Sequence, residues 1–159
     1  MARGHFAHVS VSAATRVQPC NAPRLLGEQG LWAYKLHSTV RAGFPSPAED
    51  FEGQRIDVLE RLVKHPQATY SMKVRGESMR EAGIFDGDVL LVDRAIKPSH
   101  GHIVVAVVDG DFTVKTLHQR DGRMHLKAAN PTFVDITPTE GQTVEVWGVV
   151  IAAIKQFKS

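Results

Sequence analysis

The sequence has little cysteine and no long hydrophobic stretch. Its single cysteine, Cys20, cannot form an internal disulfide, and a reducing cytoplasm is the default compartment for such a chain. The longest apolar runs, residues 103–108 and 149–154, are too short to span a bilayer. Ser, His, Arg or Pro interrupts every apolar stretch of residues 1–30, so we expect neither a secretory signal nor a membrane anchor.

Positive charge is also scarce in the part that we expect to fold. The 159 residues, 43% of them hydrophobic, suit one globular domain with an extension. Residues 1–41 hold five basic residues and one acidic residue (5 − 1 = +4), which leaves 14 basic and 16 acidic residues (−2) for the remainder. A nucleic-acid-binding domain normally concentrates basic charge on its folded face, so we expect no sequence-specific DNA binding. A solvated head explains the basic segment better than an anionic partner does.

The chain divides into three segments. Residues 1–41 form a poorly ordered basic head: residues 1–30 show no periodicity, and residues 31–41 fit a short strand or a short helix equally well. Residues 42–66 form an arm, which Pro45 and Pro47 keep extended, followed by an amphipathic helix predicted over residues 51–64. Residues 67–159 form a β-rich domain.

Turn residues and alternating apolar positions predict that β-rich domain. Asp109-Gly110 and Asp121-Gly122 each separate two strand-like segments, the pattern typical of a tight hairpin, and Asn130-Pro131 indicates a further turn. The expected strands cover residues 69–75, 89–92, 103–108, 112–117, 124–128 and 144–154. The fold class is therefore mainly β, with mostly antiparallel strands and one short helix.

Ser78 is the candidate nucleophile. It follows the strand predicted over residues 69–75, at a corner that contains Gly76 and before a segment that could begin a helical turn. A serine in that place can expose its hydroxyl while backbone N–H groups point at an incoming carbonyl. A helix N-cap serine is the alternative explanation of the same residues.

Lys115 is the candidate base. It shares a strand face with Thr113 and Leu117, so burial would lower its pKa and let the neutral amine accept a proton from a serine. A strand lysine that extends to water is the alternative. Ala42 and Gly43 are small enough to enter a tight cleft beside a nucleophile, although a flexible linker would have the same composition.

These segments resemble, in order, the UmuD-type SOS mutagenesis proteins of the LexA-like family of self-cleaving Ser/Lys peptidases. The similarity covers about residues 41–155 and includes residues 42–50 (AGFPSPAED), 76–79 (GESM), 112–115 (FTVK) and 147–150 (WGVV). The spacings also fit: Lys115 lies 37 residues after Ser78 (115 − 78), and Ser78 lies 36 residues after Ala42 (78 − 42). Ala42 stands where the best-known UmuD has cysteine, but Ala-Gly is the pair found in LexA-type proteins.

The resemblance implies a LexA-like C-terminal peptidase domain preceded by an extended cleavable arm. Ser78 would attack the Ala42 carbonyl, Lys115 would take the hydroxyl proton, and the backbone N–H groups of Ser78 and Glu77 would form the oxyanion hole. The bond cut would be Ala42–Gly43, and no cofactor or metal is implied. Two histidines, His100 and His102, flank Gly101, but without a cysteine or acidic pair beside them we expect solvent-facing side chains and no metal site.

The same resemblance implies the partners. A RecA filament on single-stranded DNA would stimulate the cut, and the trimmed homodimer would join a UmuC-type polymerase for translesion synthesis, with the replicative sliding clamp as a further candidate partner. A LexA-like or phage-type repressor is a disfavoured alternative, because it needs a helix-turn-helix domain before the cut and the 42 residues before Gly43 show no helical periodicity. A signal peptidase is disfavoured as well, because it needs a membrane anchor and we expect none here. A non-enzymatic polymerase-binding module needs neither.

Overall fold

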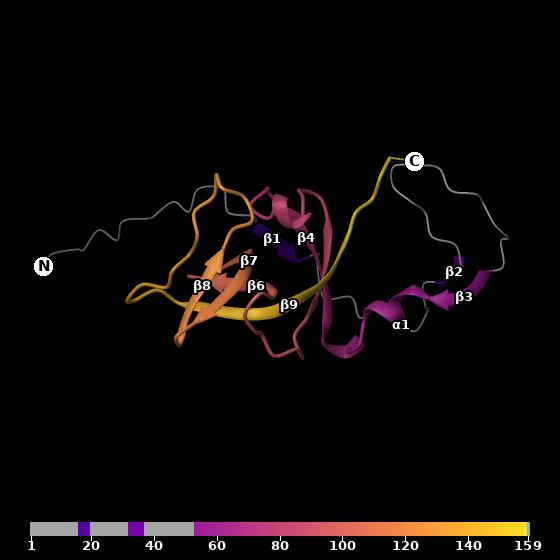
Figure 1. Cartoon of the computed structure of the whole chain (residues 1–159), viewed down its shortest axis with the longest axis horizontal. Helices are drawn as coiled ribbons and strands as arrows, with labels where there is room; N and C mark the ends of the chain where they lie inside the picture. The colour runs from indigo at the N-terminus through magenta and orange to yellow at the C-terminus, as the bar shows by residue number, and fades with distance from the viewer. Residues whose placement is uncertain (1–15, 20–31, 37–52, 159) are drawn as a thin grey trace, which may run out of the picture.

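The computed structural model describes residues 16–19, 32–36 and 53–158 of the chain. Most of them belong to one seven-stranded sheet in the order β1-β4-β5-β9-β6-β7-β8, with every neighbouring pair antiparallel (Figure 1). Its strands are β1 (Arg16–Pro19), β4 (Thr69–Arg75), β5 (Val89–Asp93), β6 (Ile103–Val108), β7 (Asp111–Arg120), β8 (Arg123–Lys127) and β9 (Val144–Ile154). The prediction of a mainly antiparallel β fold with one short helix is confirmed.

Both predicted Asp-Gly hairpins are present. Asp109 and Gly110 join β6 to β7 with φ of 49° and 89°, and Asp121 and Gly122 join β7 to β8 with φ of 51° and 73°. Two successive positive φ angles match the twist of the flanking strands, and Asp and Gly tolerate them better than most residues. These turns fix the register of β7, the strand that carries Lys115.

The helix predicted over residues 51–64 is wrong in its first half. The helix α1 covers only Val58–Leu62, and the preceding residues form β3 (Gly53–Asp57), which pairs with β2 (Trp32–Leu36). The Asp57 side chain accepts hydrogen bonds from the backbone N–H groups of Leu59 and Glu60, at 2.9 and 3.3 Å. A capping aspartate starts a helix at its own position, so the helix cannot begin earlier.

The segment left open as strand or helix, residues 31–41, contains the strand β2. The expectation that residues 1–30 lack secondary structure is wrong at β1, which pairs with the edge of β4 (Arg16 opposite Arg75, Pro19 opposite Met72). Pairing with a distant edge supplies hydrogen-bond partners that no local pattern reveals. Cys20 and the predicted cleavage residues Ala42 and Gly43 lie outside the described residues.

The sheet buries side chains on both faces, in two clusters. One cluster joins β4, β5, β6, β7 and the corner that follows β4, with the members Met72, Val74, Met79, Ile84, Leu90, Val92, Val105 and Val114. The other lies between β6, β7, β8 and β9, with the members Val104, Ala106, Val108, Leu117, Leu126 and Val149. Burial of this kind is the main stabilising term in folding, and the first cluster packs the corner after β4, through Met79 and Ile84, against the sheet.

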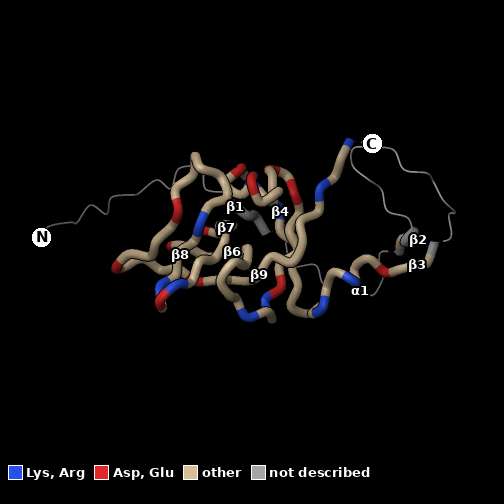
Figure 2. Tube along the Cα trace, in the orientation of Figure 1, with Lys and Arg blue, Asp and Glu red and all other residues tan. Residues whose placement is uncertain are grey.

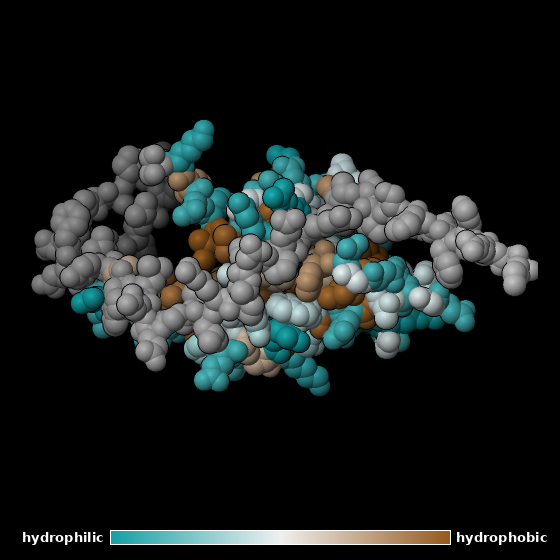
Figure 3. Space-filling view, turned by 180° about the vertical axis from the view of Figure 1, so that it is seen from behind, coloured by the Kyte–Doolittle hydropathy of each residue, from teal (hydrophilic) through white to brown (hydrophobic). Residues whose placement is uncertain are grey.

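The surface of the described residues mixes charge types and some apolar side chains. Acidic and basic residues are interspersed along the trace (Figure 2). Seen from behind, hydrophobic side chains reach the surface among hydrophilic ones (Figure 3). The exposed large hydrophobic residues are Leu62, Val134, Ile154 and Phe157. In the part of the chain that the structure describes, no helix has the length and apolarity to cross a bilayer.

Candidate active site

The backbone turns sharply where β4 ends. Gly76 follows the last strand residue with φ of 90°, a value that glycine adopts without the steric cost of a side chain. Its N–H donates to Asp86 Oδ1 at 2.7 Å, which ties the corner to the loop before β5. The turn leaves the Glu77 side chain in solvent and carries Ser78 and Met79 inward, where both are fully buried.

Ser78 does not cap the helical turn that follows. The 3₁₀-helix η2 covers Arg80–Ala82, and its N-cap position belongs to Met79. The hydroxyl of Ser78 instead lies 2.8 Å from Nζ of Lys115, which donates to it. The N-cap interpretation of Ser78 is therefore excluded, and the structure brings together the two side chains that the sequence proposed as nucleophile and base.

Lys115 is almost fully buried, with 1% of its surface exposed. Besides Ser78 Oγ, its Nζ donates to Thr113 Oγ1 at 3.3 Å and to the Val114 carbonyl at 3.1 Å. Thr113 lies two positions before Lys115 on β7, so both side chains leave the same strand face, as the sequence predicted. The alternative in which the lysine extends to water is excluded.

This environment changes the acidity of the amine. Burial lowers the pKa of Lys115 from 10.5 to about 8, because an ammonium ion loses hydration that its three neutral acceptors replace only in part. The negative charge of Asp135 opposes this change and raises the pKa. A substantial fraction of the amine is therefore neutral at mildly alkaline pH, and a neutral amine 2.8 Å from a hydroxyl can accept its proton.

The loop after β8 fixes the serine corner. Ala129 N–H donates to the Ser78 carbonyl at 2.9 Å, and Glu81 N–H donates to the Ala129 carbonyl at 2.8 Å. The side chain of Asn130 donates to the Glu77 carbonyl at 2.9 Å. The sequence indicated only a turn at Asn130-Pro131, since nothing local shows that this turn packs against a residue more than fifty positions earlier.

The predicted oxyanion donors, the N–H groups of Glu77 and Ser78, lie at this corner.

Among the described residues, no group of three or more His, Cys, Asp or Glu side chains could hold a metal ion. His100 is exposed, and its Nδ1 accepts from Gln119 N–H at 3.2 Å. Nδ1 of His102 accepts from the Ser99 N–H at 3.2 Å.

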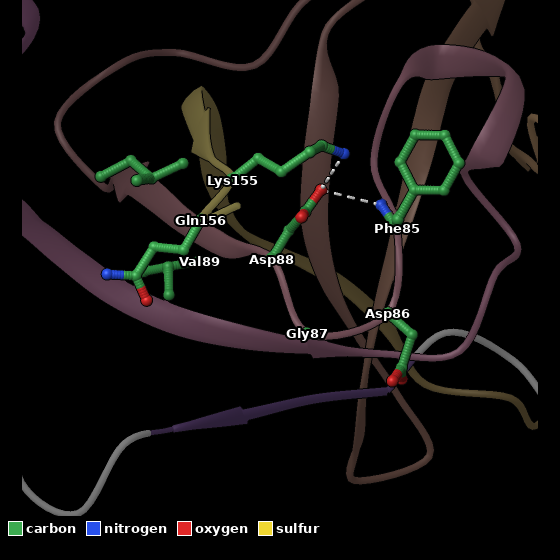
Figure 4. Close-up of a pocket in the computed structure, with 8 residues that line it drawn as sticks. Phe85, Asp86, Gly87, Asp88, Val89, Lys155 and Gln156 are labelled. Carbon is green, nitrogen blue, oxygen red and sulfur yellow. Dashed lines mark hydrogen bonds and ion pairs between the residues drawn. The ribbon is translucent and has the colours of Figure 1, made fainter. Parts of the chain in front are cut away.

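A second lysine, Lys155, lies in a different setting at the end of β9. It lines a surface pocket of about 650 Å³ together with Phe85, Asp88 and five other residues (Figure 4). Its Nζ is 3.2 Å from Oδ2 of the buried Asp88 and 3.9 Å from the centre of the Phe85 ring. The same carboxylate oxygen accepts from Phe85 N–H at 2.9 Å.

Comparison with protein families matches residues 35–151 to the family described as Peptidase S24-like. The chain belongs to this family. The S24 match covers the serine corner, β7 and the strands between them, and the β-sheet with one short helix fits the LexA-like fold of S24 peptidases.

Curated relatives place the chain among the UmuD-type members of the S24 family. Protein MucA of Salmonella typhimurium is 47% identical over 112 residues, which are 70% of this chain and 76% of MucA. Protein ImpA of Escherichia coli is 42% identical over 119 residues, 74% of this chain and 80% of ImpA. The LexA repressor of Cupriavidus taiwanensis is 39% identical over 120 residues, which are 76% of this chain but 55% of the repressor. The predicted resemblance is confirmed.

Proposed function

We propose that the protein is a serine endopeptidase that cuts its own Ala42–Gly43 bond. The observation that carries the proposal is the buried contact of 2.8 Å between Lys115 Nζ and Ser78 Oγ. It is supported by the pKa of about 8 for Lys115 and by membership of the S24 family. A serine and a neutral lysine at this distance form a minimal nucleophile and base.

The proposed reaction has two steps. Lys115 takes the hydroxyl proton as Ser78 Oγ attacks the Ala42 carbonyl, whose developing negative charge is held by the N–H groups of Ser78 and Glu77. Lys115 then gives the proton to the leaving Gly43 amine, and an Ala42 ester remains on Ser78. Water hydrolyses that ester and yields an Ala42 carboxylate, while Gly43 becomes a new N-terminus.

The biological setting is part of the same proposal. A RecA filament on single-stranded DNA stimulates the cut in the cytoplasm by raising the population of the arrangement in which the arm occupies the cleft. The trimmed homodimer then serves as an accessory subunit of a UmuC-type translesion polymerase and contacts the replicative sliding clamp. Similarity to UmuD-type proteins supports the SOS mutagenesis context in general, and the cut would remove the head of charge +4 from a body of charge −2.

Intact mass spectrometry of the purified chain tests the peptidase. At about pH 10, near the reference pKa of lysine, Lys115 is neutral and we expect slow cutting without RecA. A fragment that begins at Gly43 should form from the unaltered chain and not from Ser78→Ala or Lys115→Ala. If Ser78→Ala is still trimmed after Ala42, the assignment of the nucleophile is wrong. If no cut occurs even with RecA, ATP and single-stranded DNA, the protein is a binding module.

A further inference from the structure

The peptide unit between Glu77 and Ser78 is held from outside the serine corner. Its carbonyl accepts two hydrogen bonds: one from Arg80 N–H at 3.2 Å, within the local turn, and one from Asn130 Nδ2 at 2.9 Å, from the loop after β8. The local turn η2 has only three residues. Such a short 3₁₀ turn is weakly self-supporting, so the bond from Asn130 is the stronger restraint on this carbonyl.

The orientation of the Asn130 amide is fixed by unambiguous groups on both sides. Its Oδ1 accepts from Thr132 N–H at 3.1 Å and from Thr132 Oγ1 at 2.8 Å, and a backbone N–H can only donate. Its Nδ2 therefore faces the Glu77 carbonyl, which can only accept. Phe133 N–H closes the turn on the Asn130 carbonyl at 3.0 Å, and Pro131 restricts the backbone between them.

The restraint on the carbonyl also sets the direction of an N–H group. In a trans peptide, C=O and N–H point in opposite directions in one plane. A Glu77 carbonyl drawn toward Asn130 therefore directs the Ser78 N–H away from the loop. Ala129 N–H holds the next carbonyl, that of Ser78, at 2.9 Å, so two successive peptide units are oriented by the same loop.

We propose that Asn130 is a positioning residue that orients the Glu77–Ser78 peptide so that the Ser78 N–H faces the oxygen of the scissile carbonyl. This inference rests on the proposed peptidase activity, because the oxyanion matters only if Ser78 attacks a carbonyl. Among the described residues, the side chain of Asn130 bonds to the Glu77 carbonyl and to Thr132, and to neither Ser78 Oγ nor Lys115 Nζ. It therefore acts on the geometry of transition-state stabilisation and not on proton transfer.

Two substitutions separate positioning from simple support of the turn. Asn130→Asp keeps an acceptor for Thr132 but has no donor for the Glu77 carbonyl, whereas Asn130→Ala loses both functions. Gln142→Ala is the matched control, because Gln142 is an amide in another loop whose Nε2 donates to Asp109 Oδ2 at 3.0 Å. The first-order rate of appearance of the Gly43 fragment is measured by intact mass spectrometry on the full chain between pH 7 and pH 11, beside the thermal unfolding midpoint.

Both Asn130 variants should cut about 10- to 100-fold more slowly than the unaltered chain on the alkaline plateau, where Lys115 is neutral in every variant. Asn130→Ala should keep the pH midpoint of the rate, since the contacts of Lys115 are unchanged. Its thermal midpoint should fall no further than that of Gln142→Ala. A general loss of stability would not lower the plateau rate while leaving the pH midpoint of the rate unchanged.

Other results overturn the inference. Plateau rates within about twofold of the unaltered chain would show that Asn130 does not set the oxyanion geometry. If Asn130→Asp cuts at the normal rate and Asn130→Ala cuts slowly, Asn130 only supports the turn and does not orient the peptide. An equal loss in Gln142→Ala would point to general destabilisation. If the unaltered chain releases no Gly43 fragment at any pH, the proposed peptidase fails first and this role fails with it.

Discussion

Lys115 and Lys155 both turn their ammonium groups toward the protein, yet they meet different partners. Lys115 on β7 is 1% exposed and donates to neutral oxygens of a serine, a threonine and a backbone carbonyl. Lys155 keeps 36% of its side chain exposed and lies 3.2 Å from the buried carboxylate of Asp88, above the Phe85 ring.

The comparison shows what decides the role of a buried or half-buried lysine. The carboxylate of Asp88 balances the ammonium charge of Lys155, so Lys155 suits a structural ion pair. Neutral partners in a dry site leave the charge uncompensated, so the pKa of Lys115 falls to about 8 and the amine becomes available as a base. Four predictions test this contrast, in decreasing order of the expected effect.

Exchange of each lysine for methionine should separate the two roles. Lys115→Met removes the proposed base and should slow the proposed self-cleavage by about 10³-fold or more. It should not lower stability at pH 7, because a poorly compensated buried charge disappears. Lys155→Met should leave the cutting rate within about twofold and lower the free energy of unfolding by about 1 kcal/mol or less. Intact mass spectrometry and urea unfolding measure the two effects. Equal rate losses in the two variants would contradict the contrast.

The pH dependence should show the lowered pKa of Lys115 in both rate and stability. The cutting rate should rise with pH to a plateau, with its midpoint at a pH of about 8. Between that value and 10.5 the folded lysine is neutral while the unfolded one is charged, so the unfolded state binds more protons and stability rises with pH. Urea unfolding at stepped pH measures this effect. Across this pH window, the free energy of unfolding of the unaltered chain should rise by about 3 kcal/mol relative to that of Lys115→Met. A difference in free energy of unfolding between the two chains that does not change with pH would contradict the lowered pKa of Lys115.

Neutralising the partner of Lys155 should affect stability alone. Asp88→Asn keeps an acceptor near Phe85 N–H but removes the charge that faces Lys155, and should lower the free energy of unfolding by about 1 to 2 kcal/mol. Urea unfolding measures this loss, and the plateau rate of self-cleavage serves as the internal control. A tenfold slower plateau in this variant would mean that the pocket and the Ser78 corner are coupled.

Removing the charge of Asp135 should lower the pKa of Lys115 further, and it has the smallest expected effect of the four changes. In the unaltered chain, Ala128 N–H donates to Asp135 Oδ1 at 2.8 Å, and the side-chain oxygen of Asp135→Asn can still accept this bond. The variant has no negative charge, so it no longer raises the pKa of Lys115. The cutting rate at pH 7 should increase about two- to threefold, and high salt should reduce the difference because Asp135 is exposed. Asp121→Asn, in the β7–β8 turn, is the matched control and should leave the rate unchanged.

Much of the architecture could be predicted because its signals are local. The Asp-Gly pairs at 109–110 and 121–122 require positive φ angles, so they located two hairpins and the strand between them. The helix boundary was missed because the apolar spacing of residues 51–64 did not show that Asp57 would cap the helix in place. The strand β1 was missed because its partner, β4, lies more than fifty residues away in the sequence.

The candidate site divides in the same way. Sequence alone named Ser78 and Lys115 and, through the order and spacing of the motifs, the family to which the chain belongs. It could not decide between an N-cap and a nucleophile at Ser78, or between a solvated and a buried amine at Lys115. Only the tertiary structure excluded the N-cap and the solvated amine, by placing Nζ 2.8 Å from Oγ in a buried site and the Asn130 loop against the serine corner. The physical reason is that burial, and with it the pKa of a lysine, depends on residues that pack together from distant parts of the chain.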